Sequence, residues 1–154
     1  MEQVYTANQI LDSILDKTGV FMLYGRPAAG KTALMLQVAD EINKRKAGTV
    51  LIFSLEASEA LLRRRIQQQG ISDNCMVIDD DPHLTAEQIE RRIKQVGNVS
   101  VLCIDYLQLM EKAVREQLPR IAEEFDILIL AVGVLDRKGY EEDKGVYLCA
   151  QNGN

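Results

Sequence analysis

Residues 25–32 read Gly25-Arg26-Pro27-Ala28-Ala29-Gly30-Lys31-Thr32, a stretch with the spacing G-x-x-x-x-G-K-T. An apolar run over 20–24 precedes this stretch, and a helical pattern begins at Ala33. In a strand–loop–helix of this kind, backbone N–H groups of the loop surround a phosphate at the helix N-terminus. Lys31 would then reach the β- and γ-phosphates, and the Thr32 hydroxyl would ligate Mg²⁺. The eight residues therefore predict a binding loop for a nucleoside triphosphate, and we expect the Lys31 side chain to face the ligand rather than pack in the core.

Helical and strand patterns alternate along the rest of the chain. The apolar periodicity and the capping residues predict helices over 6–18, 33–46, 58–69, 85–96 and 111–124. Strands are predicted over 20–24, 49–55, 75–78, 99–104 and 127–134, with a last strand or hairpin arm over 145–150. Because these strands are apolar on both faces and are separated by helices, we expect an α/β fold with a mostly parallel sheet and helices on both faces. We expect one domain, made of an N-terminal helix over 1–18, a core over 19–137 and a hairpin or tail over 138–154.

The composition is that of a globular domain without a membrane segment. Of the 154 residues 47% are apolar and 27% are charged, and no apolar stretch approaches the roughly 20 residues of a membrane span. The start of the chain lacks the pattern of a signal peptide, so we expect a cytoplasmic protein. The three cysteines have no C-x-x-C spacing and are expected to be reduced thiols, and the single histidine, His83, argues against a histidine metal site. The net charge of −5 argues against strong binding to nucleic acid.

Two of the predicted strands end in an acid. The apolar run 99–104 leads into Asp105, and a carboxylate at this place in a nucleotide-binding sheet fixes the hydration shell of Mg²⁺. We therefore expect Asp105 to act with Thr32 at a magnesium site. The run 51–55 leads into Glu56, which is a candidate general base for an attacking water. Alternatively, Glu56 begins the following helix, where a negative charge favours the helix dipole, and the spacing does not decide between the two.

Three segments around these residues occur in a distinctive order. Residues 26–33 read R-P-A-A-G-K-T-A, residues 53–58 read F-S-L-E-A-S, and residues 104–110 read I-D-Y-L-Q-L-M. In this order they resemble the ATPase domain of DnaB-type replicative helicases, and the resemblance covers residues 18–137.

The resemblance implies a RecA-like P-loop fold with ATP and Mg²⁺ as cofactors. It implies that Lys31 and Thr32 hold the phosphate and the metal ion, that Asp105 is the Walker B acid, and that Glu56 is the catalytic base. Arg65 aligns with an arginine that the family often carries on the helix after its glutamate. For that side chain the alternative is a solvated arginine run over 63–65.

The chain also departs from the family pattern. Met110 is followed at once by Glu111, where the family has a longer segment with a loop that faces the DNA channel. Val134 stands where the family has a glutamine that senses the γ-phosphate, and valine cannot form that hydrogen bond. The sequence ends at Asn154. By the resemblance we expect a minimal, divergent domain without the second DNA loop, the basic finger and the N-terminal primase-interacting domain.

These observations favour an ATP-binding domain with slow or partner-dependent Mg²⁺-ATPase activity that is not a helicase by itself. Two alternatives stay open. One is a non-catalytic nucleotide-binding module that docks on a helicase or another replication ATPase, and the other is a helicase domain that needs additional chains. We expect a protein partner or a homo-oligomer, weak or no direct binding to nucleic acid, and no binding to a membrane.

Overall fold

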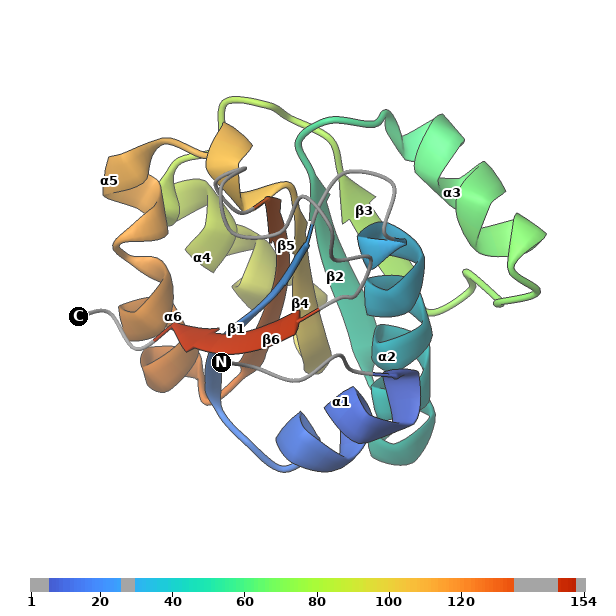
Figure 1. Cartoon of the computed structure of the whole chain (residues 1–154). Coiled ribbons are helices and arrows are strands. Elements are labelled where there is room, and N and C mark those ends of the chain that lie inside the picture. Colours follow the sequence, from blue (N-terminus) through green and yellow to red (C-terminus); the bar gives the residue numbers. More distant parts are fainter. Residues whose placement is uncertain (1–5, 26–29, 135–146, 152–154) are drawn as a thin grey trace.

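The strands form a single sheet, and the helices flank it (Figure 1). The computed structural model describes residues 6–25, 30–134 and 147–151. The helices are α1 (Ala7–Ile14), α2 (Lys31–Lys46), α3 (Glu59–Gln68), α4 (Ala86–Val96), α5 (Lys112–Arg115) and α6 (Leu118–Phe125), with one 3₁₀ turn, η1 (Leu107–Leu109). The strands are β1 (Gly19–Gly25), β2 (Thr49–Ser54), β3 (Met76–Asp79), β4 (Val99–Asp105), β5 (Leu128–Val134) and β6 (Tyr147–Gln151).

The strand order in the sheet is β3-β2-β4-β5-β1-β6. Strands β1 to β5 pair in parallel, and β6 runs antiparallel to β1 at one edge. The prediction of an α/β fold with a mostly parallel sheet is therefore confirmed. Parallel pairing brings the carboxyl ends of β1, β2 and β4 to the same end of the sheet, which is where ligands bind in folds of this kind.

Alternate residues of the strands face two separate cores. Val101 and Cys103 of β4 lie in one core with side chains of α1, α2 and α3. Leu102 and Ile104 lie in the other core with side chains of α4, α5 and α6. All four side chains are fully buried, and burial of a large apolar side chain contributes about 1.5–3 kcal/mol. The strands are apolar on both faces because helices cover both faces of the sheet, as predicted.

The two predicted capping boxes are present. The Thr6 hydroxyl accepts the Gln9 N–H at 3.3 Å, while the Gln9 side chain accepts the Thr6 N–H at 2.9 Å. Thr85 and Gln88 repeat this arrangement at the start of α4, with distances of 3.2 and 2.8 Å. These bonds satisfy backbone donors that the first helical turn leaves without a partner.

The prediction of one helix over 111–124 is wrong, because two helices, α5 and α6, occupy this segment. Pro119 lies in the first turn of α6. It has no N–H to donate to the carbonyl of Arg115, and its ring crowds that carbonyl, so a continuous helix is interrupted here. The N–H of Gln117 instead donates to the carbonyl of Val114 at 3.0 Å, which closes a turn between the two helices.

The two ends of the chain differ from the expected boundaries. The helix predicted over 6–18 ends at Ile14. The Thr18 hydroxyl donates to Oδ1 of Asp126 at 2.7 Å, and this bond connects the segment before β1 with the segment before β5. The tail predicted over 138–154 falls largely outside the described residues, and β6 is its described part. The division of the chain into one domain and a tail stays a prediction. Within the described ranges, no helix is long and apolar enough to cross a membrane.

Candidate nucleotide-binding site

The predicted phosphate loop leaves the end of β1 and enters α2. Gly25 is the last residue of β1, Gly30 is the N-cap of α2, and Lys31 begins the helix. Gly30 has a φ of 81°, and no heavy atom lies within 4 Å of the position that a Cβ would take. Glycine is therefore required by the left-handed backbone conformation and not by space. The other loop residues lie outside the described ranges, and their roles stay predictions: Arg26, Pro27, Ala28 and Ala29.

Lys31 is buried, with only 3% of its surface exposed, so the expectation that its side chain is not packed is wrong. Its ammonium donates to the carbonyl oxygen of Gly25 at 2.9 Å, and the side chain therefore lies back along the entrance of the loop. Burial lowers the pKa of Lys31, while the carboxylates of Asp105 and Glu56 act in the opposite direction. The lysine is thus a partly desolvated cation held near two acids.

Thr32 and Asp105 meet although 73 residues separate them in the sequence. The Thr32 hydroxyl lies 3.3 Å from each carboxylate oxygen of Asp105, whose surface is only 1% exposed. The sheet brings these two residues together. Strand β4 ends at Asp105, at the same end of the sheet at which β1 leads into the phosphate loop and α2 begins. The two residues predicted to bind magnesium are therefore brought together.

The environment of Asp105 suits a cation. Burial raises the pKa of its carboxyl group, and the Glu56 carboxylate adds to the rise, whereas the hydrogen bond from Thr32 and the charges of Arg65 and Lys31 oppose it. A net rise indicates that the neighbouring groups do not fully compensate this buried negative charge.

The donor set also suits a magnesium ion that arrives with a nucleotide. Mg²⁺ usually takes one or two protein oxygens and completes its shell with substrate phosphates and water. Among the described residues, no group of three or more His, Cys, Asp or Glu side chains could hold a metal ion. Thr32 and Asp105 offer oxygen ligands of the kind that a nucleotide-bound Mg²⁺ takes from a protein.

Glu56 lies beyond the end of β2, next to the Asp105 strand. The backbone N–H of Leu55 donates to the carbonyl of Asp105 at 2.7 Å, and the Ser54 hydroxyl donates to the carbonyl of Ala57 at 2.6 Å. These bonds fix the turn that carries Glu56. Its carboxylate is exposed and still acts on the pKa values of Lys31 and Asp105, so it lies beside the candidate site.

The alternative interpretation of Glu56, as the first residue of a helix, is wrong. Helix α3 begins at Glu59, and the side chain of Ser58 caps it by accepting the Leu61 N–H at 3.2 Å. Glu59 is the acid in the first turn of this helix. Glu56 is therefore free of that structural role, and its assignment as a general base stays a prediction.

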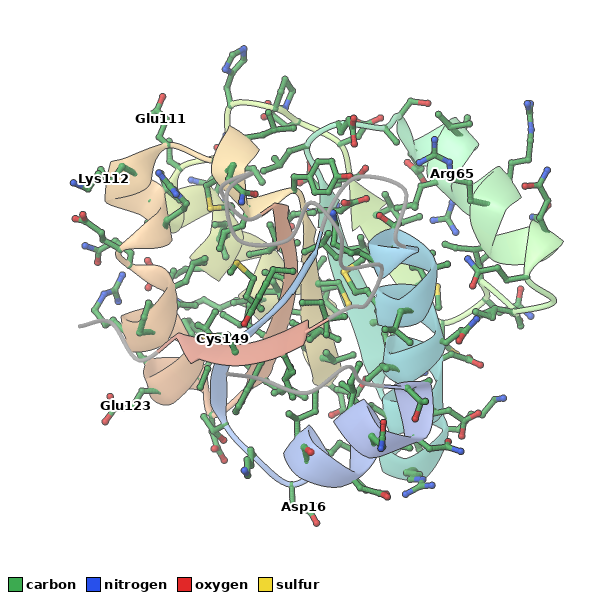
Figure 2. The ribbon with its side chains drawn as sticks, in the orientation of Figure 1. Asp16, Arg65, Glu111, Lys112, Glu123 and Cys149 are labelled. Carbon is green, nitrogen blue, oxygen red and sulfur yellow. The ribbon has the colours of Figure 1, made fainter. Side chains whose placement is uncertain are left out.

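The three arginines of α3 have different surroundings. Arg63 is structural, because it pairs with Glu59 at 2.8 Å and with Asp73 at 3.1 Å. Arg65 is exposed, and its charge lowers the pKa values of Asp105 and Tyr106, so it lies near the candidate site. Figure 2 shows Arg65 on α3 in the upper part of the view, the end at which β1, β2 and β4 finish. The run over 63–65 is thus not uniformly solvated, and a role of Arg65 in phosphate binding stays a prediction.

One further residue at the site was not identified from the sequence. Tyr106 directly follows Asp105, and the Lys31 ammonium lies 5.6 Å from the centre of its ring. The sequence feature that could have identified Tyr106 is its position within the segment I-D-Y-L-Q-L-M. Near the end of β5, a Cβ at Gly133 would come within 2.6 Å of the Met22 sulfur and 3.1 Å of Gln108 Nε2, so these two side chains occupy the space that a larger residue would need.

Val134 pairs with Gly25 in the register of β5 and β1. The position where the family has a glutamine therefore adjoins the start of the phosphate loop. The side chain of Val134 lies outside the described part of the structure, and its effect on phosphate sensing stays a prediction.

The sequence of this chain is similar to those of known proteins. Residues 5–125 match a family described as "AAA domain". The chain is similar to a "Probable replicative DNA helicase" of Trieres chinensis, with 26% identity over 82% of this chain and 38% of the relative. It is also similar to "Replicative DNA helicase DnaC" of Bacillus subtilis (strain 168), with 26% identity over 79% of this chain and 36% of the relative, and to "Replicative DNA helicase DnaB" of Geobacillus stearothermophilus, with 26% identity over 86% and 39%. The chain thus spans less than two fifths of the length of each of these curated relatives.

A solved structure described as an "ATPase Domain" supports the fold. It superposes with a TM-score of 0.66 at 20% identity, and the match covers 84% of this chain and 61% of that chain. The family match extends over most of the chain. The chain therefore belongs to the AAA domain family, as a DnaB-like domain with a RecA-like fold.

Proposed function

We propose that this domain binds ATP with Mg²⁺ and hydrolyses it slowly or only in contact with a partner chain. The observation that supports this most strongly is the contact between Thr32 and Asp105, in which one hydroxyl lies 3.3 Å from both oxygens of a buried carboxylate. The paired hydroxyl and carboxylate oxygens are the ligands that a nucleotide-bound Mg²⁺ needs from a protein.

Each residue at the site has a distinct part in this proposal. The loop from Gly25 to Thr32 surrounds the phosphates, and the Lys31 ammonium neutralises charge on the β- and γ-phosphates. Thr32 and Asp105 hold Mg²⁺, which when bound shields the negative charge that develops on the phosphates. Glu56 accepts a proton from the water that attacks the γ-phosphate. Its exposed carboxylate is accessible to that water and lies close enough to Lys31 and Asp105 to act on their pKa values.

Two observations support slow or partner-dependent turnover: the valine at position 134 and the greater length of the relatives. Valine beside Gly25 offers no hydrogen bond to a γ-phosphate. An arginine supplied by another chain can raise the rate of phosphoryl transfer ~10³–10⁵-fold. The relatives are named replicative DNA helicases and are longer than this chain. We therefore propose that a second copy of the chain or a helicase completes the site.

A non-catalytic docking module is a second candidate. A missing γ-phosphate contact at Val134 would leave nucleotide binding largely intact and impair turnover, so ATP would then act as a structural ligand. In either case the net charge of −5 supports weak or no binding to single-stranded DNA, because such binding depends on basic side chains that contact phosphates.

Phosphate release from ATP tests the proposal. We expect the protein to show slow turnover that requires Mg²⁺, is lost in Lys31→Met, rises with a helicase partner and is unchanged by single-stranded DNA alone. ATP binding without turnover under all these conditions would favour the docking module. Turnover stimulated by DNA would favour a helicase domain completed by further chains, and a failure to bind ATP would reject the proposal.

A further inference from the structure

Tyr106 stands at the centre of the candidate site without an assigned role. It follows Asp105 at the end of β4, and its half-buried ring packs against the edge of the core that contains α2. Fully buried residues such as Phe53 and Met35 form the interior of the two cores. Tyr106 is therefore not one of the fully buried residues of the core.

One of its polar neighbours is Lys31. Its ammonium lies 5.6 Å from the centre of the Tyr106 ring, within the distance of about 6 Å at which a cation interacts with an aromatic face. Such contacts are stronger when the cation is desolvated, and Lys31 is only 3% exposed. The ring and the carbonyl of Gly25 both hold the ammonium beside the phosphate loop.

We propose that Tyr106 is a positioning residue whose ring holds the Lys31 ammonium in place for the phosphates of the nucleotide. This inference rests on the proposed ATP site. A lysine without this contact would keep its charge and lose its fixed position, so that each binding event would have to order a long, flexible side chain. The ring, and not the hydroxyl, is the part of Tyr106 that matters.

A matched pair of variants separates the ring from the hydroxyl. Tyr106→Phe keeps the aromatic face, whereas Tyr106→Leu keeps an apolar side chain and removes the face. Calorimetry measures the affinity of each protein for ATP with Mg²⁺. Nuclear magnetic resonance of protein labelled with ¹³C at lysine Cε follows the titration of Lys31 without nucleotide, and Lys31→Met identifies its resonance. Urea unfolding of each nucleotide-free protein reports whether the fold is intact.

We expect Tyr106→Phe to resemble the parent in both readouts. Tyr106→Leu should bind ATP more weakly by roughly 2- to 30-fold, the range that corresponds to measured cation–π energies. Lys31 should also titrate at lower pH in this variant, because the ammonium loses a group that stabilises it. A change of stability alone would produce neither the shift in titration nor its rescue by phenylalanine.

Three results would overturn the inference. The first is a Tyr106→Leu protein with the ATP affinity and the Lys31 titration of the parent. The second is an equal loss of ATP affinity in the leucine and phenylalanine variants. The third is a Tyr106→Leu protein that binds ATP more weakly while its Lys31 titration is unchanged. If the leucine variant does not fold, Tyr106→Met gives the same comparison with a flexible side chain that fills the space. If the parent itself does not bind ATP, the proposed function fails, and the lysine titration still decides whether the ring holds Lys31.

Discussion

Removing the ammonium of Lys31 is the sharpest test of the phosphate loop. Because the side chain is 3% exposed, Lys31→Ala would remove packed methylene groups together with the charge and could not separate binding from stability. Lys31→Met keeps an apolar stem of similar length and removes the ammonium alone. Lys44→Met is the matched control, since Lys44 lies near the other end of α2 and its side chain is 63% exposed.

The size of the expected loss follows from the contacts that the ammonium makes. Hydrogen bonds to charged groups contribute about 1.5–3 kcal/mol each, so two bonds to the β- and γ-phosphates would contribute about 3–6 kcal/mol, or ~10²–10⁴-fold in Kd. The ammonium already donates to the carbonyl of Gly25 at 2.9 Å and must give up part of this bond to reach the phosphates. We therefore expect a loss near the lower limit, ~10²-fold.

The stability of the nucleotide-free protein should change in the opposite direction. Burial lowers the pKa of Lys31 below its ordinary value of 10.5, so the folded state disfavours the ammonium at neutral pH. The parent then gains stability as the pH rises from that lowered pKa to 10.5. Lys31→Met should be at least as stable as the parent at pH ~7, and its advantage should shrink in alkaline solution.

Calorimetric titration with ATP and Mg²⁺ measures the affinity, and urea unfolding at neutral and alkaline pH measures the stability. A Lys31→Met protein that keeps its fold and binds ATP within about threefold of the parent would refute the assignment of the loop. So would a Lys44→Met protein that loses as much affinity as Lys31→Met, because the loss would then reflect general charge and not the loop.

Three further predictions concern the two acids and DNA. Asp105→Asn should remove the Mg²⁺ dependence of ATP binding in calorimetry. Because burial raises the pKa of Asp105, this variant should also be more stable than the nucleotide-free parent at neutral pH, and urea unfolding should show the advantage disappear as the pH falls from that raised pKa to 3.8. Glu56→Gln should keep the ATP affinity and lower phosphate release ~10²–10⁴-fold, and equal losses of affinity in the two acid variants would contradict their division of roles. The parent, with its net charge of −5, should not bind labelled single-stranded DNA at micromolar concentration in ~150 mM salt, and anisotropy that shows such binding with a steep salt dependence would restore the helicase interpretation.

Most of the fold could be predicted because the strands carry an unambiguous pattern. Residues such as Leu102 and Cys103 are adjacent and both fully buried, which requires helices on both faces of a parallel sheet. The interruption of the last helical segment was missed because the apolar periodicity continues across Pro119, and periodicity alone does not register a missing N–H. The order of the strands was not predicted either, since it depends on contacts between segments far apart in the sequence.

The site could be predicted where it breaks the local pattern. Asp105 is a carboxylate at the end of an otherwise apolar strand, and Lys31 is a charge within the first turn of a helix that packs in the core. Burial shifts the pKa of each toward its neutral form, so both positions cost stability in the nucleotide-free fold. A sequence under selection for stability alone would place apolar residues there, and the departure marks a function.

Tyr106 breaks no such pattern, and for that reason the sequence does not reveal it. A tyrosine after a buried strand is ordinary. Its position becomes significant only when the fold brings it beside Lys31. Residues that take part in the chemistry depart from the apolar pattern of their own segment. Residues that position them are recognised only from their contacts in the folded structure. The second kind of residue should therefore be sought in the neighbours of the first.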